Sequence, residues 1–172
     1  MMWLFWVLVA VIGLQRVGEL LLNRRNQRRL LSKGARLVEA DGYRLIVAVH
    51  ALWFVGLIAE GPAGPWAGVW AATWPLLAAY GAAEGLRLWT MGTLGERWTT
   101  RVIVIPGAEP IEAGPFRILD HPIYVAVTIE LVALPVAFGL PVTAVAIGVA
   151  NLLALRSRIR TEEAALAKAA AS

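Results

Sequence analysis

The 172-residue sequence contains no cysteine, only two histidines and only three serines. Without cysteine the chain forms no disulfide, builds no thiolate metal site and has no thiol nucleophile, and no metal ion is expected. The serines stand at Ser32, Ser157 and Ser172, and none lies in the G-x-S-x-G turn of serine hydrolases. The glycine patterns of P-loops and dinucleotide-binding domains are also missing, which argues against a soluble nucleotide-binding domain.

Charged residues are scarce as well. They make up 16% of the chain, against 59% hydrophobic residues, and the mean hydropathy is +0.65. A chain of this size cannot bury so much apolar surface in one soluble core, so the expected solvent is a lipid bilayer. We expect a single membrane domain over residues 1–172. Trp3, Trp66 and Trp89 lie near the ends of apolar runs, which is typical of the aromatic belt at a membrane interface.

Five apolar runs predict membrane helices, since a helix needs roughly 20 residues to cross about 30 Å of hydrocarbon. The runs cover residues 1–22, 43–60, 69–89, 124–138 and 142–155. The last two are shorter, and only three residues separate them, so they predict a helical hairpin whose arms are tilted or cross incompletely. The predicted fold class is an all-α integral membrane protein with about five transmembrane helices. Three N-terminal helices (1–89) precede a second region (90–172) that holds the hairpin and a tail.

The charges between these runs predict which side of the membrane each segment faces. Residues 23–36 carry six cations and no acid, whereas residues 61–68 carry no charge. Because cytoplasmic loops are enriched in Lys and Arg, we place the basic loop 23–36 in the cytoplasm, and alternation places residues 90–122 and the C-terminus there too. The N-terminus is then outside, as an uncleaved anchor, and the plasma (inner) membrane is the expected location. The cations would meet anionic membrane lipids, and they lack the interleaved aromatic residues of a nucleic-acid site.

Two polar segments stand at the two ends of the predicted hairpin. They are GPFRILDHPIY, residues 114–124, and RSRIRTEEAALAK, residues 156–168. Folding of the hairpin brings these segments together on one side of the membrane. Pro122 suits the first turn of a helix that begins near His121, because its missing N–H would have no helical partner there. The free N–H groups of such a helix start favour a carboxylate or another acceptor-rich ligand.

Three stretches of this second region resemble the isoprenylcysteine carboxyl methyltransferase family, especially its small bacterial members. They are LGERWTTRVIVIPGAEPIEAGPF, GPFRILDHPIYVAV and RIRTEEAAL, the last two separated by the hydrophobic hairpin. The resemblance covers roughly residues 86–166, and the first three helices agree by hydropathy alone. Asp120 stands where the family usually has an arginine, and Arg117 lies three residues before it.

The resemblance implies methyl transfer that depends on S-adenosylmethionine, in a membrane-embedded fold unrelated to the Rossmann methyltransferases. Residues 90–172 would then form the cofactor-binding region. The side chains that would line the cofactor pocket are Ile111, Phe116, His121, Pro122, Tyr124 and Glu163. Aromatic faces of Phe116 and Tyr124 suit the adenine and the sulfonium cation, and Glu163 can accept hydrogen bonds from ribose hydroxyls or the amino group.

The methyl acceptor implied by this family is a hydrophobic, lipid-like small molecule, and no obligate protein partner is expected. Arg158 would bind it, with Arg158 and Glu163 as the catalytic residues. A carboxylate acceptor is already ionised at pH 7 and needs only to be oriented by Arg158, whereas a phenol or enol must lose a proton, for which His121 is the nearby imidazole. Both chemistries stay open. Glu130 has no partner within a helical turn, so it either contacts Asn151 across the hairpin or lines the channel that binds the substrate.

Two other functions compete with methyl transfer. Membrane reductases of the sterol-reductase type have a similar C-terminal hairpin and use NADPH, whose 2′-phosphate requires cations. Arg97, Arg101 and Arg117 could supply those cations, but the RIRTEEAAL ending resembles the methyltransferases more closely. The third possibility is a noncatalytic membrane scaffold.

Cysteine substitution tests the predicted topology on a chain that has no thiol of its own. Cysteine at Ser32 or Ser172 should stay unlabelled by a membrane-impermeant maleimide in intact cells, because both positions are predicted to be cytoplasmic. Cysteine at Gly64 should be labelled. Labelling at Ser32 alone among the three positions would contradict the topology.

Overall fold

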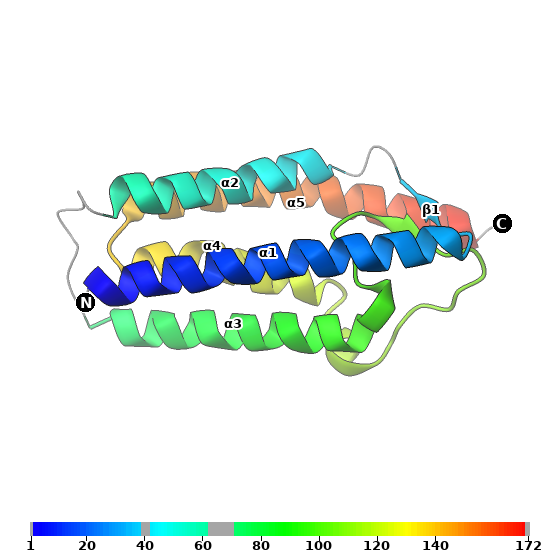
Figure 1. Ribbon diagram of the computed structural model, residues 1–172, viewed down its shortest axis with the longest axis horizontal. Coiled ribbons are helices and arrows are strands. Elements are labelled where there is room, and N and C mark those ends of the chain that lie inside the picture. Colours follow the sequence, from blue (N-terminus) through cyan, green and yellow to red (C-terminus); the bar gives the residue numbers. More distant parts are fainter. Residues whose placement is uncertain (1, 39–41, 62–70, 171–172) are drawn as a thin grey trace.

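Five helices run along the long axis of the computed structural model, which describes residues 2–38, 42–61 and 71–170 (Figure 1). They are α1 (Met2–Ser32), α2 (Tyr43–Glu60), α3 (Thr73–Leu94), α4 (Pro122–Ala137) and α5 (Pro141–Ala170). α1, α3 and α5 run in one direction and α2 and α4 in the other, so the ends of α1 and α5 lie at the same end of the bundle. The predicted all-α membrane fold with a C-terminal hairpin is confirmed. Gly64, Trp66 and Ser172 lie outside the described residues.

Three helix boundaries differ from the predicted ones. α1 continues to Ser32, so most of the predicted basic loop 23–36 is helical. Residues 23–33 contain no glycine or proline, and Gly34, whose φ is 87°, follows the end of the helix. α5 joins the predicted fifth span and the charged tail in one helix of 30 residues, because Ala, Leu, Arg and Glu all favour a helix. α3 begins at Thr73 and continues past Trp89 to Leu94.

The helices differ in whether they are long and apolar enough to cross a membrane. Of the described helices, α1, α2 and α5 are long and apolar enough to cross a membrane. α4 is a shorter apolar helix of 16 residues, close to its predicted length. α3 has 22 residues, but no 18-residue stretch of it is as apolar as the stretches in α1, α2 and α5. The chain is therefore an integral membrane protein in which α3 and α4 pack most extensively against each other.

α2 and α5 pack antiparallel at very short range. A Cβ added at Gly56 would lie 2.7 Å from Thr143 Oγ1, so a larger residue could not occupy that position without displacing α5. The carboxylate of Glu60 accepts hydrogen bonds from the backbone N–H groups of Val142 (3.1 Å) and Thr143 (2.7 Å). These N–H groups have no acceptor within α5, and Glu60 therefore caps the helix from its neighbour.

Two backbone carbonyls of α4 accept hydrogen bonds from side chains of other helices. Pro135 has no N–H to donate to the carbonyl of Leu131, four residues before it. The indole Nε1 of Trp53 on α2 donates to that carbonyl at 3.0 Å. Near the end of α4, Thr73 Oγ1 donates to the carbonyl of Ala137 at 3.0 Å. This matters in a membrane, where water cannot supply the missing partners.

Five charged side chains from α1, α3 and α4 meet inside the bundle. We call this group the ionic cluster; it consists of Arg16, Glu19, Glu84, Arg87 and Glu130. Arg87 Nε donates to Glu130 at 2.8 Å, Arg87 Nη2 bonds to the same carboxylate, and Arg87 Nη1 donates to Glu19 at 3.2 Å. Arg16 contacts all three carboxylates at 2.8–3.2 Å. Two guanidinium groups thus hold three carboxylates, and each helix supplies at least one charge.

The hypothesis that Glu130 contacts Asn151 across the hairpin is wrong. Glu130 is 2% exposed and bonds to the arginines of the ionic cluster, whereas Asn151 Nδ2 donates to Thr128 Oγ1 at 3.1 Å. The physical reason is charge: a carboxylate removed from solvent needs a cation, which an amide cannot provide.

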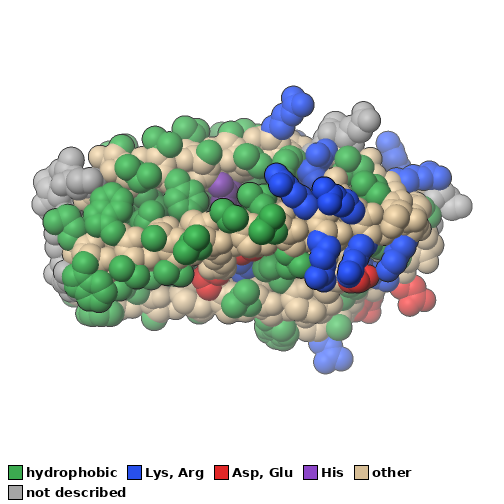
Figure 2. Space-filling model, in the orientation of Figure 1, with side chains coloured by type: hydrophobic (Ala, Val, Ile, Leu, Met, Phe, Trp, Pro, Cys, Tyr) green, Lys and Arg blue, Asp and Glu red, His purple; other side chains and the backbone are tan. Residues whose placement is uncertain are grey.

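Cations gather at the end of the bundle where α1 and α5 terminate, while hydrophobic side chains are spread over the rest of this face (Figure 2). We call this the basic end. Arg24, Arg25 and Arg28 are exposed. Glu96 in the short helix η1 (Gly95–Arg97) pairs there with Lys33 at 3.0 Å and Arg29 at 2.6 Å. Hydrogen bonds and charge from Lys33, and then from Arg29, lower the pKa of the Glu96 carboxyl.

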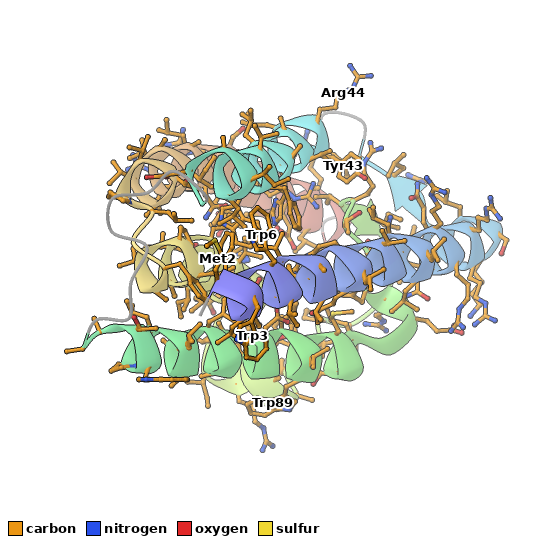
Figure 3. All side chains as sticks on the ribbon, turned by 60° about the vertical axis from the view of Figure 1, so that its left-hand side comes forward. Met2, Trp3, Trp6, Tyr43, Arg44 and Trp89 are labelled. Carbon is orange, nitrogen blue, oxygen red and sulfur yellow. The ribbon has the colours of Figure 1, made fainter. Side chains whose placement is uncertain are left out.

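Two exposed tryptophan side chains, Trp3 and Trp89, lie near opposite ends of the bundle. Trp3, on the first turn of α1, is 70% exposed, and Trp89, near the other end of α3, is 52% exposed (Figure 3). Such positions are typical of residues at the two membrane interfaces.

Replacing Arg87 with methionine should lower the free energy of unfolding by about 3–5 kcal/mol, because it leaves three carboxylates with one guanidinium. The measurement is reversible unfolding in mixed micelles. Arg29→Met is the matched control: Arg29 also pairs with a glutamate, but its side chain is 48% exposed, and little change is expected. The double variant Arg87→Met/Glu130→Met should recover part of the loss. Equal stability of Arg87→Met and Arg29→Met would contradict a structural role for the ionic cluster.

Candidate functional site

The His-Pro-x-Tyr element begins α4 at the basic end. His121 is the residue before the helix, and Pro122, which is buried, is its first residue, as predicted. The imidazole of His121 stacks on the ring of Tyr124, with centroids 5.2 Å apart and planes 22° from parallel. The proline therefore sets the helix start, and the start places two flat rings side by side.

Charged residues of α5 meet these rings, as the hairpin predicted. The hydroxyl of Tyr124 donates to Glu162 and accepts from Arg158 Nε at 3.3 Å. His121 Nε2 lies 3.4 Å from a carboxylate oxygen of Glu163. The Glu163 side chain is 62% exposed and that of His121 is 25% exposed, so this pair faces outward while Arg158 lies deeper.

Arg158 is 6% exposed and reaches a third segment of the chain. Its Nη2 donates to the backbone carbonyl of Thr100 at 2.9 Å. Thr100 lies in the connection between η1 and the strand β2 (Ile103–Val104), which pairs antiparallel with β1 (Arg36–Leu37). The orientation of the guanidinium thus depends on the tyrosine of α4 and on a loop held next to the end of α1.

Ile111 and Phe116 lie on the segment that approaches α4. Phe116 belongs to the short helix η2 (Gly114–Arg117), and both side chains are half-buried. Gly114 has a φ of 59°, and a Cβ there would clash with the side chain of Thr93, so η2 passes very close to α3. Among the described residues, no hydrogen bond, ion pair or ring contact joins Ile111 or Phe116 to the group around Tyr124.

Two partners of the site were not predicted. Glu162 accepts a hydrogen bond from the hydroxyl of Tyr124, 38 residues away in the sequence. Thr100 takes part through its backbone carbonyl, and no sequence pattern marks a carbonyl that will accept from a distant arginine. Glu130 is joined to the ionic cluster and has no described bond to these residues.

The site combines groups of different chemistry within a small region. It offers a stacked aromatic pair, two carboxylates and one buried guanidinium. Within the described residues, no group of three or more His, Asp or Glu side chains is arranged to hold a metal ion. The arrangement suits a ligand that carries a positive charge and hydrogen-bond donors, next to a second ligand with an anionic or acidic group.

Comparison with known proteins shows the family to which the chain belongs. The sequence profile of the isoprenylcysteine carboxyl methyltransferase (ICMT) family matches residues 76–168, which include α4 and nearly all of α5 up to Lys168. The uncharacterized protein YpbQ of Bacillus subtilis (strain 168) is 31% identical over 169 residues, which cover 95% of this chain and 96% of YpbQ. No solved structure matches the chain. Because the family profile spans more than half of the sequence and the relative covers nearly all of it, the chain belongs to the isoprenylcysteine carboxyl methyltransferase family.

Proposed function

We propose that the protein transfers a methyl group from S-adenosylmethionine to an oxygen of a hydrophobic, lipid-like acceptor at the membrane. The observation that carries the proposal is the meeting of His121 and Tyr124 with Arg158 and Glu163 at the basic end of α4 and α5. Family membership supports a methyltransferase, and ICMT-family methyltransferases use S-adenosylmethionine as the donor. The apolar surface of the surrounding helices supports an acceptor that reaches the site from the lipid.

The side chains present fit this donor. S-adenosylmethionine supplies an activated methyl group on a sulfonium cation. The ring of Tyr124 offers an aromatic face to a cation, and the carboxylates of Glu162 and Glu163 attract one. Glu163 is the more exposed carboxylate and can accept hydrogen bonds from ribose hydroxyls or the amino group. Ile111, Phe116 and Pro122 would complete the apolar wall of the pocket.

The acceptor oxygen belongs either to a carboxylate or to an acidic hydroxyl, and one contact supports each. Arg158 can orient a carboxylate by two parallel hydrogen bonds, which supports the first. His121, 3.4 Å from Glu163, can take a proton and be stabilised as an imidazolium by that carboxylate, which supports the second. We favour the carboxylate, because Arg158 lies inside the site and His121 at its edge.

A reductase is not favoured by the positions of the three candidate arginines. Arg97 Nη1 donates to the carbonyl of Glu109 at 2.8 Å, and the guanidinium of Arg101 lies 5.0 Å from the ring centroid of Tyr43. Arg117 is exposed in η2. Arg97 and Arg101 thus contact different neighbours, and the three arginines do not form one site for the 2′-phosphate of NADPH.

Glu163→Gln should weaken S-adenosylmethionine binding by about 1–3 kcal/mol, toward the lower end because the side chain is 62% exposed. Binding of labelled S-adenosylmethionine to detergent-purified protein measures this, with NADPH as the competing ligand. Glu112→Gln, an exposed acid on the segment before η2, is the matched control and should bind as the wild type does. Specific binding of NADPH without binding of S-adenosylmethionine would overturn the proposed function.

Arg158→Lys and His121→Asn distinguish the two acceptors. With a carboxylate, Arg158→Lys should lower turnover markedly, since an ammonium cannot form the planar two-bond contact, and His121→Asn should leave the pH profile flat near neutrality. With a phenol or enol, His121→Asn should remove a limb of the pH–rate profile, because the acceptor proton then has no base to accept it, and Arg158→Lys should be milder. The measurement is methyl transfer against pH at saturating donor, with a long-chain acid and an alkylated phenol. Loss of a limb of the pH–rate profile in His121→Asn, together with almost unchanged turnover in Arg158→Lys, would show that the acceptor is not a carboxylate.

A further inference from the structure

Two asparagines are buried in the part of α1 beyond residue 22, where the helix packs against residues 95–100. Asn23 is 4% exposed and Asn26 is 1% exposed, although residues 24, 25 and 28 of the same helix are exposed cations. Asparagines three residues apart share one helical face, and this face is turned toward the loop formed by residues 95–100. Asparagine is seldom buried without a reason, because its amide must find partners.

The partners of both asparagines are backbone groups of that loop. Asn26 Nδ2 donates to the carbonyls of Gly95 (3.2 Å) and Trp98 (2.9 Å). Asn23 Oδ1 accepts from the backbone N–H of Thr100 at 2.8 Å. Thr100 is the residue whose carbonyl accepts from Arg158 Nη2 at 2.9 Å. A continuous chain of hydrogen bonds therefore runs from Asn23 through Thr100 to the guanidinium of Arg158.

A further backbone hydrogen bond holds the chain just after this loop. Val38 donates its N–H to the carbonyl of Val102 at 3.0 Å, next to the paired strands β1 and β2. With residues 95–100 bonded to α1 and residue 102 bonded beside β1, Thr100 has little freedom to move. Its carbonyl then acts as a fixed acceptor for Arg158, and not as one that adjusts to the guanidinium.

We propose that Asn23 is a positioning residue of the transferase: through Thr100, it sets the orientation of the Arg158 guanidinium that binds the acceptor. The inference rests on the proposed function for its effect on catalysis. Asn23 lies outside residues 76–168, the part of the chain that matches the family profile, so the N-terminal helix contributes to a site otherwise built by α4, α5 and the connection between η1 and β2. Asn26 has the parallel role of holding the loop at Gly95 and Trp98.

The direction of each hydrogen bond predicts which substitutions of Asn23 and Asn26 are tolerated. Asn23 acts as an acceptor, so aspartate can replace it, whereas leucine keeps the volume but removes the acceptor oxygen. Asn26 acts as a donor, so aspartate cannot replace it and would place a carboxylate against two carbonyls. Asn23→Asp should therefore be tolerated, and both Asn23→Leu and Asn26→Asp should be damaging.

The experiment compares Asn23→Leu and Asn23→Asp with the wild type in full-length, detergent-purified protein. Hydrogen–deuterium exchange of the Thr100 amide should be about tenfold faster in Asn23→Leu and unchanged in Asn23→Asp. Turnover of the acceptor should fall about tenfold in Asn23→Leu, with the affinity for S-adenosylmethionine within about twofold of the wild type. In an Arg158→Lys background, Asn23→Leu should cause little further loss, because both changes act on the same contact.

Two outcomes would overturn the inference. One is wild-type exchange at Thr100 in Asn23→Leu; the other is equal damage by Asn23→Asp and Asn23→Leu, which would indicate packing and not an accepted hydrogen bond. Failure of the proposed function looks different, since the wild type itself would then neither bind S-adenosylmethionine nor transfer methyl. The exchange of Thr100 would still decide whether Asn23 holds the loop. If Asn23→Leu does not fold, Asn23→Ser, with a shorter acceptor, takes its place with the same expected order.

Discussion

In the apolar interior of the bundle, the carboxylate of Glu130 must stay beside a guanidinium, because an unpaired buried charge costs several kcal/mol. Arg87 on α3 and Arg16 on α1 provide that charge, and Glu19 and Glu84 complete the ionic cluster. The closest backbone packing joins α3 with α4, α2 with α5 and α4 with α5, and α1 is not part of it. Side chains therefore join α1 to the bundle: Phe5, Val9 and Ile12 pack into the apolar core, and the long charged side chains of the ionic cluster help to fix how far along the bundle α1 lies.

The position of α1 has consequences at the site. Because α1 is a single helix from Met2 to Ser32, fixing Arg16 and Glu19 also fixes the residues one to two turns further along. These residues include Asn23 and Asn26, which hold the loop at Trp98 and Thr100. The ionic cluster in the middle of the bundle therefore helps to determine the geometry around Arg158 at its end.

The hairpin accounts for what could be predicted of the site. Only Phe138, Gly139 and Leu140 lie between α4 and α5. The start of α4 therefore has to meet the second half of the longer α5. Pro122 marked the first turn of α4, and the meeting of His121 and Tyr124 with Arg158 and Glu163 followed. The role of Glu130 did not follow, because its cation partners come from helices that have no short connection to α4.

Sequence alone determined the membrane class, the five helices and the hairpin, because hydropathy, helical period and connection length are local properties. The resemblance to the methyltransferase family is also read from short stretches of sequence. The tertiary structure decided which helix faces which. Glu130 bonds a residue 43 positions away and another 114 positions away, and Asn23 reaches Thr100 across 77 positions. Such partners depend on the lateral order and rotation of helices in the bundle. Those are set by the packing of all side chains together and by the need to pair every buried charge.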